Sequence, residues 1–173
     1  MKKPPLALIG HSFHQTTRSH DFLLTMLEKI YDVDSYWDES WKDGRAVDIA
    51  SIGGRYQHIV CFQMFYKHNP DIMSPLTGKN VTIMPMYDNV SSKKPKYWKQ
   101  YQDFKFFCFC RKNAVDIATV NRQCLYLQYY PPVQQREITG NVKPVIYFWQ
   151  RVNEISWSIV RELLDPEQIG GVI

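Results

Sequence analysis

The chain has 173 residues, of which 45% are hydrophobic and 22% are charged, values typical of a globular protein with one well-buried core. The net charge of +4 argues against nucleic acid as a partner, because proteins that bind it usually carry a concentrated basic stripe. No apolar run approaches the roughly 18–20 residues that cross a bilayer, and the apolar run near the amino terminus is too short for a signal peptide.

The first 37 residues have the pattern of a strand, a helix and a second strand. An apolar run over 6–9 leads directly into a glycine-containing loop, and apolar residues at helical spacing follow over 22–30. N-cap candidates over 16–19 predict that this helix begins near Thr17. Alternation over 33–37 predicts the second strand, and together these elements are the opening of a parallel doubly wound sheet.

The same alternation continues, and no Asn-Gly or Asp-Gly hairpin turn joins neighbouring apolar runs. Further strands are predicted over 58–63, 80–84, 104–110 and 125–129, and a helix over 111–120. We therefore predict an α/β fold, in which a Rossmann-like, doubly wound and mainly parallel sheet forms the middle of three layers, α/β/α.

A polar stretch over 131–143 separates this pattern from the rest of the chain. We interpret it as a linker between a first domain over 1–130 and a second that starts at 144. The second domain is predicted to open with a strand over 144–149, an amphipathic helix over 155–164 and the beginning of another strand at 170. We expect the chain to be a fragment, because it stops within that strand; the alternative is a complete protein whose last helix folds back onto the first sheet.

The cysteines give no sign of a metal site. Three of the four lie in strongly apolar runs, where a free thiol behaves as a small hydrophobic group. Cys108 and Cys110 are spaced C-x-C, and no pair of histidines follows at the spacing of metal ligands. We therefore predict no metal and no other cofactor, and reduced thiols in a cytoplasmic protein.

Ligands of open parallel sheets bind beyond the carboxyl ends of the strands. This rule selects the loops after the first, third and fourth strands and the loop after residue 110. The first loop is the most informative, because Gly10 allows close approach of a ligand and His11, Ser12 and His14 can orient a sugar or accept a proton. A structural hydrogen-bonding role for these histidines stays open. The loop matches neither the dinucleotide fingerprint nor the P-loop.

Two later loops add candidates. Tyr87 and Asp88 follow the fourth strand, where Asp88 can bind an acceptor hydroxyl, act as a base or cap the next helix. Arg111 follows the fifth strand and suits an anion, unless it is merely solvated. The densest basic stretch, 93–99, is interleaved with aromatic residues; it is either a contact for phosphate or a membrane surface, or the solvated face of a short helix.

These features together resemble the amino-terminal domain of bacterial GT-B-fold glycosyltransferases of the capsule and lipopolysaccharide type. The resemblance rests on the segments LALIGHSFH, IMPMYDN, FFCFCRKNAV and LYLQYYPPV, with PVIYFWQR and EISWSIVRELL where that family's second domain opens. It implies an enzyme of polysaccharide biosynthesis that moves a sugar from a nucleotide-sugar donor to a glycan or lipid-linked acceptor. Such enzymes need no bound metal and work in the cytoplasm, also at the inner face of the membrane.

The resemblance also implies which domain binds which substrate. The amino-terminal domain supplies the acceptor side, with the loop over 10–14 facing the transferred sugar, and the second domain binds most of the donor, so this fragment is expected to be inactive alone. The alternative is a non-catalytic flavodoxin-like or nucleotide-binding module. A flavin module would have a Ser/Thr-rich phosphate loop after the first strand, which Ser12, Thr16 and Thr17 provide only loosely. An oxidoreductase is disfavoured by the absent glycine fingerprint.

Overall fold

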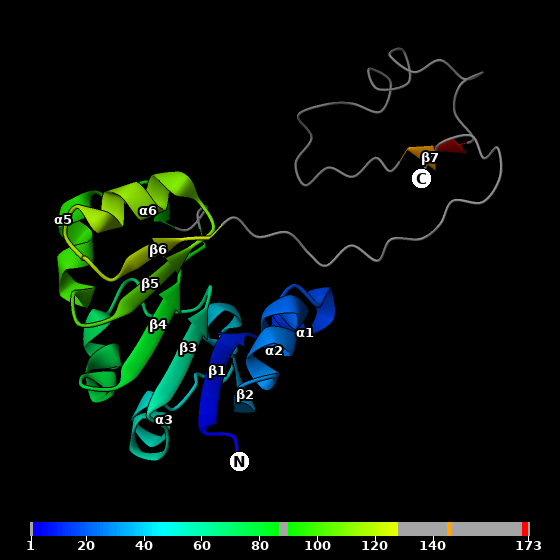
Figure 1. The fold of residues 1–173 in the computed structure, drawn as a ribbon, viewed down its shortest axis with the longest axis horizontal. Helices are drawn as coiled ribbons and strands as arrows, with labels where there is room; N and C mark the ends of the chain where they lie inside the picture. The colour runs from blue at the N-terminus through cyan, green and yellow to red at the C-terminus, as the bar shows by residue number, and fades with distance from the viewer. Residues whose placement is uncertain (1, 87–89, 128–144, 147–170, 173) are drawn as a thin grey trace. The chain divides into compact units, whose positions relative to one another are not determined.

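The computed structural model describes residues 2–86, 90–127, 145–146 and 171–172, and its first unit contains a six-stranded sheet (Figure 1). All neighbouring strands pair in parallel, in the order β2-β1-β3-β4-β5-β6. The strands are β1 (Pro5–His11), β2 (Asp32–Asp38), β3 (His58–Phe62), β4 (Asn80–Met84), β5 (Lys105–Cys108) and β6 (Cys124–Tyr126). This confirms the predicted Rossmann-like α/β fold with a mainly parallel sheet.

The order of the strands reverses beside β1. β2 is added on one side of β1, whereas β3 to β6 are added on the other. Ile9 in β1 accordingly lies opposite Tyr36 in β2 and Cys61 in β3. In open parallel sheets a crevice forms at such a switch point, outside the carboxyl ends of the strands. The topology therefore directs attention to the ends of β1, β2 and β3.

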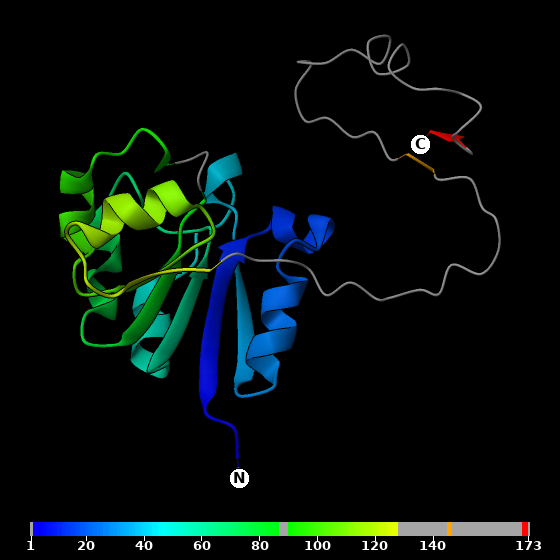
Figure 2. The ribbon, with the colours of Figure 1, turned by 45° about the horizontal axis from the view of Figure 1, so that its top comes forward.

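Helices pack on both faces of the sheet (Figure 2). The helices are α1 (Phe13–Thr17), α2 (Asp21–Glu28), α3 (Ile49–Arg55), α5 (Pro95–Trp98) and α6 (Arg111–Ala118), with 3-10 turns η1 (Ser40–Lys42), η2 (Pro70–Leu76) and η3 (Lys99–Tyr101). Alternate residues of each strand point to opposite faces. On one face, Ala7 and Ile9 belong to a core with α3, η2, α5 and α6, and on the other, Leu6 and Leu8 pack with Leu23 of α2.

The prediction that the helix after the first strand begins near Thr17 is wrong. Thr17 is the last residue of α1, and α2 begins at Asp21. Arg18 causes the break, because it adopts the left-handed conformation (φ 56) and its N–H donates to the carbonyl of His14. A residue in this conformation commonly ends a helix. The chain thus forms two short helices where a single helix was expected.

The basic stretch over 93–99 contains the short helix α5. Its Trp98 is buried in the core beside Phe106, whereas Lys94, Lys96 and Lys99 are exposed. Contact of these lysines with phosphate or a membrane surface stays a prediction. None of the helices in the described ranges is long and apolar enough to cross a membrane.

The contacts within the chain divide it into two compact units, Met1–Pro132 and Val133–Ile173. In the second unit the structure describes one parallel pair of strands, β7 (Val145–Ile146) and β8 (Gly171–Val172). Both lie where strands were expected, from 144 and from 170. The linker expected over 131–143 and the helix expected over 155–164 fall outside the described residues.

Candidate functional site

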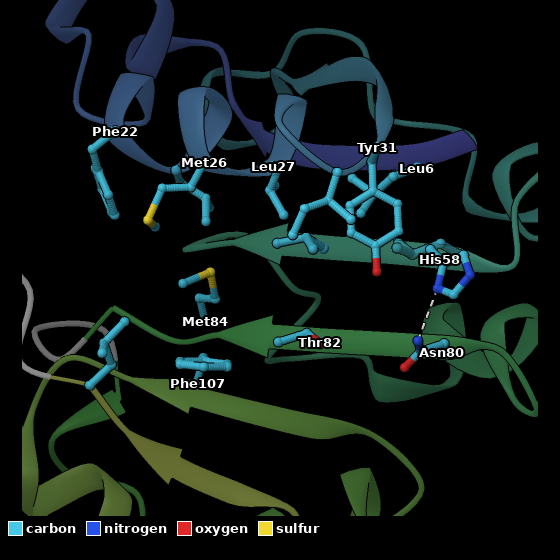
Figure 3. Close-up of a pocket in the computed structure, with 15 residues that line it drawn as sticks. Leu6, Phe22, Met26, Leu27, Tyr31, His58, Asn80, Thr82, Met84 and Phe107 are labelled. Atoms are coloured by element: carbon cyan, nitrogen blue, oxygen red, sulfur yellow. Dashed lines mark hydrogen bonds between the residues drawn. The ribbon is translucent and has the colours of Figure 1, made fainter. Parts of the chain in front are cut away.

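An apolar groove of about 280 Å³ lies between α2 and the sheet (Figure 3). Phe22, Met26 and Leu27 of α2 form one wall, and Met84 and Phe107 lie on the strands that face them. At the amino end of the strands, Asn80 Nδ2 donates a hydrogen bond to His58 Nδ1 (2.9 Å). The groove therefore offers mainly packing surface, and it lies along the sheet face rather than at the carboxyl edge where ligands of this fold bind.

A second cavity, of about 420 Å³, opens at the carboxyl ends of β1, β2 and β3. This cleft thus lies at the switch point of the sheet, where ligands are expected. Its wall includes His11 from the end of β1 and Asp38 from the end of β2. The remaining wall comes from the loops after β2 and β3: Ser40, Trp41, Gln63, Met64, Phe65, Tyr66, Lys67, His68 and Asn69. The loop after β3 is one of the four that the strand-end rule selected.

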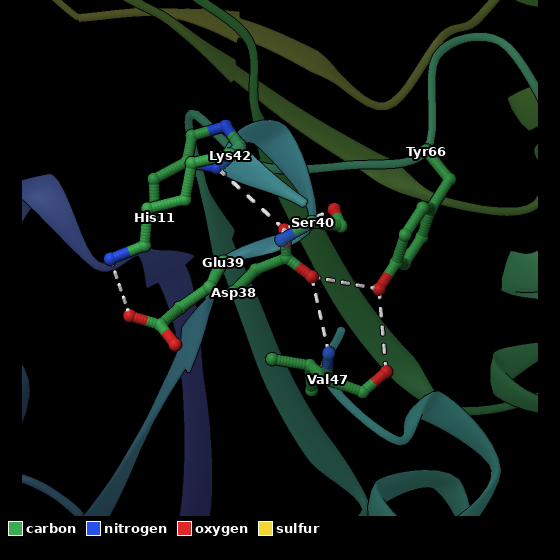
Figure 4. Close-up of polar contacts among 7 residues, drawn as sticks. All are labelled: His11, Asp38, Glu39, Ser40, Lys42, Val47 and Tyr66. Atoms are coloured by element: carbon green, nitrogen blue, oxygen red, sulfur yellow. Dashed lines mark hydrogen bonds and ion pairs between the residues drawn. The ribbon is translucent and has the colours of Figure 1, made fainter. Parts of the chain in front are cut away.

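The Asp38 carboxylate accepts hydrogen bonds from the two loops that line the cleft. It is only 1% exposed, and each of its oxygens accepts two hydrogen bonds (Figure 4). Ser40 donates its N–H (3.1 Å) and its hydroxyl (2.5 Å) to Oδ1, while the Val47 N–H (3.1 Å) and the Tyr66 hydroxyl (3.0 Å) donate to Oδ2. These four bonds compensate the burial of the charge and tie the loops after β2 and β3 to one carboxylate.

Tyr66 is a donor in this network because its hydroxyl stays protonated. Burial raises the pKa of Tyr66, and the charge of Asp38 and the hydrogen bond to it raise this pKa further. The same hydroxyl lies 3.3 Å from the carbonyl oxygen of Val47. The network therefore fixes the tyrosine ring in the wall of the cleft.

His11 faces the same carboxylate. Its Nδ1 lies 3.9 Å from Asp38 Oδ1 and is buried with no hydrogen-bond partner among the residues that the structure describes. Burial lowers the pKa of His11 below its ordinary value of 6.5, and the positive charge of Lys67 lowers it further. The negative charge of Asp38 and a hydrogen bond with the Gln63 main chain raise this pKa, but their effect is smaller than that of burial. His11 is therefore neutral near pH 7. A neutral imidazole beside a carboxylate can accept a proton, because the carboxylate stabilises the imidazolium that results.

His14 has a different environment. It is completely buried, its Nδ1 shares a hydrogen bond with the Ser19 hydroxyl (2.7 Å), and its ring packs against Phe13 and Phe62, with centroids 4.1 and 4.9 Å away. Burial lowers the pKa of His14 to about 4, and the neighbouring histidines His11 and His20 contribute to this shift. The structure thus brings His14 to within 6.1 Å of the His11 ring, but as a neutral packing residue outside the cleft wall.

The loop predicted over 10–14 is shorter in the structure, because Gly10 and His11 end β1 and Ser12 alone separates β1 from α1. A Cβ atom on Gly10 would lie 3.1 Å from Trp37 Cζ3 and 3.4 Å from His14 Cδ2, so this glycine makes room for two rings. The Ser12 N–H donates to the carbonyl of Asp38 (3.0 Å). The pKa of Glu39 is lowered mainly by the hydrogen bond and the charge of Lys42, and to a smaller extent by a hydrogen bond with the Ser12 hydroxyl. Gly10 and Ser12 therefore shape the end of β1 next to the cleft.

Of the other predicted site residues, the structure describes Arg111. Arg111 is the exposed first residue of α6, at the carboxyl end of β5, and β3 and β4 separate that strand from β1. It is not part of the cleft wall. Tyr87 and Asp88 lie outside the described residues, so their roles stay predictions.

Gln63 marks the point where β3 ends and the cleft begins. It has φ 57, and its N–H donates to the carbonyl of Met84 (2.8 Å). Residues other than glycine adopt this conformation at a cost of roughly 1–2 kcal/mol, and such residues cluster at functional sites. The bend at Gln63 starts the loop over 63–69 that lines the cleft.

Asp38, Trp41 and Tyr66 were not predicted as site residues. The sequence did hold a signal for Asp38, because it directly follows the alternating run over 33–37, and the strand-end rule applies to this strand as to the others. Trp41 follows three positions later in the same loop. Tyr66 lies in a loop that was selected, but nothing in the sequence paired it with Asp38.

No group of three or more His, Cys, Asp or Glu side chains that could hold a metal ion occurs within 2–86, 90–127 and the two short strands of the second unit. No protein-family model matches the chain, and neither the curated proteins nor the solved structures contain a match to it. Any function must therefore be argued from the geometry of the cleft.

Proposed function

We propose that this chain contains, over residues 1–130, the acceptor-side domain of a glycosyltransferase, an enzyme that moves a sugar from a nucleotide-sugar donor to the hydroxyl of a glycan or lipid-linked acceptor. The observation that carries the proposal is the His11–Asp38 pair, in which Nδ1 and Oδ1 lie 3.9 Å apart in the wall of a cleft at the carboxyl edge of the sheet. A base at this edge is what activation of a hydroxyl requires.

The proposed reaction assigns His11 a defined step. The acceptor oxygen forms a bond to the anomeric carbon of the donor sugar, while the bond from that carbon to the diphosphate breaks and its electron pair leaves with the diphosphate. The proton of the acceptor hydroxyl passes to the His11 imidazole, which is neutral because burial lowers its pKa. Asp38, whose Oδ1 lies 3.9 Å from Nδ1, stabilises the resulting imidazolium through its charge.

The remainder of the cleft supports an acceptor rather than a nucleotide at this position. The segment GHSFH spans the end of β1, Ser12 and the start of α1, a helix of only five residues, and it contains neither of the glycine-rich phosphate loops. Gln63, His68 and Asn69 line the cleft, and amide and imidazole groups can donate to and accept from hydroxyls. We expect the donor to be bound mainly by a second domain, as the resemblance implies.

Binding by the chain itself tests the proposal. The ¹⁵N-labelled chain is titrated with disaccharides (maltose, lactose, cellobiose and chitobiose) and, separately, with UDP-glucose and GDP-mannose. We expect at least one disaccharide to shift the amide resonances of His11, Gln63 and Tyr66, and His11→Gln to retain this binding. Disaccharides that leave all three resonances unchanged at millimolar concentration would overturn the proposal.

A flavodoxin-like binding module is the second candidate, and one observation favours it. The order β2-β1-β3-β4-β5 is that of flavodoxin-like sheets, which bind FMN at the β1/β3 switch point. The same titration with FMN separates the two candidates. Quenching of flavin fluorescence, with shifts at Ser12 and Phe13, would favour the flavin module over the transferase.

A further inference from the structure

We propose that Trp41 is the platform on which a sugar ring of the acceptor stacks, so that this cleft recognises the carbohydrate part of the acceptor. The inference rests on the proposed function and deepens it by naming the class of ligand and the residue that selects it. Trp41 lines the cleft together with His11 and Gln63, and it has no part in the proton transfer assigned to His11.

The exposure of Trp41 is the first reason. Its side chain is 54% exposed, whereas Trp98 is buried in the core. Burying an aromatic ring removes a large apolar area from water, so a ring left open at the rim of a cleft provides binding energy to a ligand that covers it. Aromatic residues in this position are typical of binding surfaces.

Trp41 is also held in place before any ligand arrives. It is the central residue of η1, whose first residue, Ser40, donates both its N–H and its hydroxyl to the buried Asp38 carboxylate. The ring of Phe13 meets the indole at 90°, with centroids 5.9 Å apart. These contacts restrict the indole before a ligand binds, and this restriction lowers the entropic cost of binding.

The groups around the indole suit a polyhydroxylated ring. A pyranose presents a face of C–H bonds, whose slight positive charge complements the negative face of an indole, and hydroxyls around its edge. Gln63, His68 and Asn69 line the same cleft and can bond such hydroxyls. An alkyl chain would leave these polar groups without partners, and that costs binding energy.

The charges in the wall favour a neutral ring over a nucleotide. The wall contains one carboxylate, Asp38, and one ammonium, Lys67, while Glu39, the neighbour of Asp38 in the chain, pairs with Lys42 at 2.7 Å between Oε1 and Nζ. The acidic and basic groups therefore balance, and the wall has no excess of positive charge that would attract a phosphate. A nucleobase could still stack on Trp41, and the test therefore includes nucleotides.

Fluorine NMR of the indole provides the test. The chain contains five tryptophans, and 5-fluorotryptophan labelling gives each its own ¹⁹F resonance, with that of Trp41 assigned by its loss in Trp41→Phe. The labelled chain is titrated with the four disaccharides and, separately, with UMP and AMP. We expect a disaccharide to shift the Trp41 resonance. We expect Trp41→Ala to weaken its binding about tenfold, and Trp41→Phe only about two- to threefold.

Tyr126→Ala is the matched control, because Tyr126 is another exposed aromatic residue (46%) but lies on β6, away from the cleft; it should leave binding unchanged. Disaccharide shifts at His11 with undiminished binding to Trp41→Ala would overturn the role of Trp41 and leave the proposed function standing. If UMP or AMP alone shifts Trp41, or if no disaccharide binds, both the role of Trp41 and the carbohydrate acceptor are wrong.

Discussion

His11 and Asp38 are register partners at the carboxyl ends of β1 and β2, and this pairing brings Nδ1 of the imidazole to 3.9 Å from Oδ1 of the carboxylate. Neighbouring parallel strands that end at the same level place their last side chains at one edge of the sheet. The sheet itself thus builds the pair, and the hydrogen bonds to Asp38 keep the carboxylate in place.

Replacing Asp38 with asparagine should change both stability and titration. The amide nitrogen of asparagine cannot accept hydrogen bonds, so the two donors that bond the replaced oxygen, from Ser40 or from Val47 and Tyr66, lose their acceptor. This loss should lower the free energy of unfolding by about 1–3 kcal/mol. Since the Asp38 charge raises the pKa of His11, Asp38→Asn should lower this pKa further. Urea unfolding and NMR titration of the His11 ring protons measure the two effects. A rise in the His11 pKa would contradict this account, and the exposed Asp43→Asn serves as control for stability.

His14 should make the chain less stable in mild acid. Its pKa is about 4 in the folded chain and near the ordinary 6.5 when unfolded, so the unfolded state takes up more protons between these values. The contribution of His14 is complete above pH 6.5 and is lost as the pH falls toward 4, by on the order of 3 kcal/mol in total. Urea unfolding at pH 7, 5.5 and 4.5 should show this decline.

The decline should be shallower in His14→Leu, which cannot titrate. Leu23→Ala is the control, because Leu23 is buried on the same face of the sheet. This variant should lose about 2–5 kcal/mol at every pH without a change of slope. Equal slopes in the wild type and His14→Leu would show that His14 is not the group responsible.

The two glycines Gly10 and Gly54 should respond oppositely to alanine. A Cβ on Gly10 would press on the Trp37 ring, at 3.1 Å, and would touch His14, at 3.4 Å, whereas no atom lies within 4 Å of a Cβ on Gly54 in α3. Gly10→Ala should therefore cost about 1 kcal/mol through overpacking against Trp37. Gly54→Ala should add about 0.5–1 kcal/mol through helix propensity. Thermal unfolding measures both, and a Gly10→Ala variant as stable as the wild type would refute the packing role.

Because Gln63 has a left-handed backbone and lines the cleft, substitutions there should change both the stability of the chain and its binding of a disaccharide. Gln63→Gly relieves the steric cost at φ 57, whereas Gln63→Ala retains it, so the glycine variant should be more stable than the alanine variant by about 1 kcal/mol. Both variants lack the amide and should bind a disaccharide equally weakly. An alanine variant at least as stable as the glycine variant would show that the conformation costs nothing.

The sheet could be predicted because its signals are local. The run over 80–84 matches β4, and the run over 58–63 exceeds β3 by one residue, since continuous apolar segments are what a buried parallel strand requires. Helix ends were harder to predict. The break between α1 and α2 depends on the left-handed Arg18, and arginine carries no preference for that conformation that a sequence pattern would reveal.

The site could be predicted only in part, because its partners come from different strands. His11 was found from its loop, but its pairing with Asp38 depends on the register of β1 and β2. Gly10 and His14 stood out beside His11, although one makes room for rings and the other packs among them. Burial separates these roles, and burial follows from tertiary contacts rather than from neighbours in sequence.

The most direct test of the carbohydrate site is a crystal structure of the chain soaked with the disaccharide that binds most tightly. The account predicts a sugar ring stacked on the Trp41 indole, with a hydroxyl within hydrogen-bond distance of the His11 ring. A disaccharide bound instead in the apolar groove beside Met26 and Met84, with the cleft occupied only by water, would contradict it.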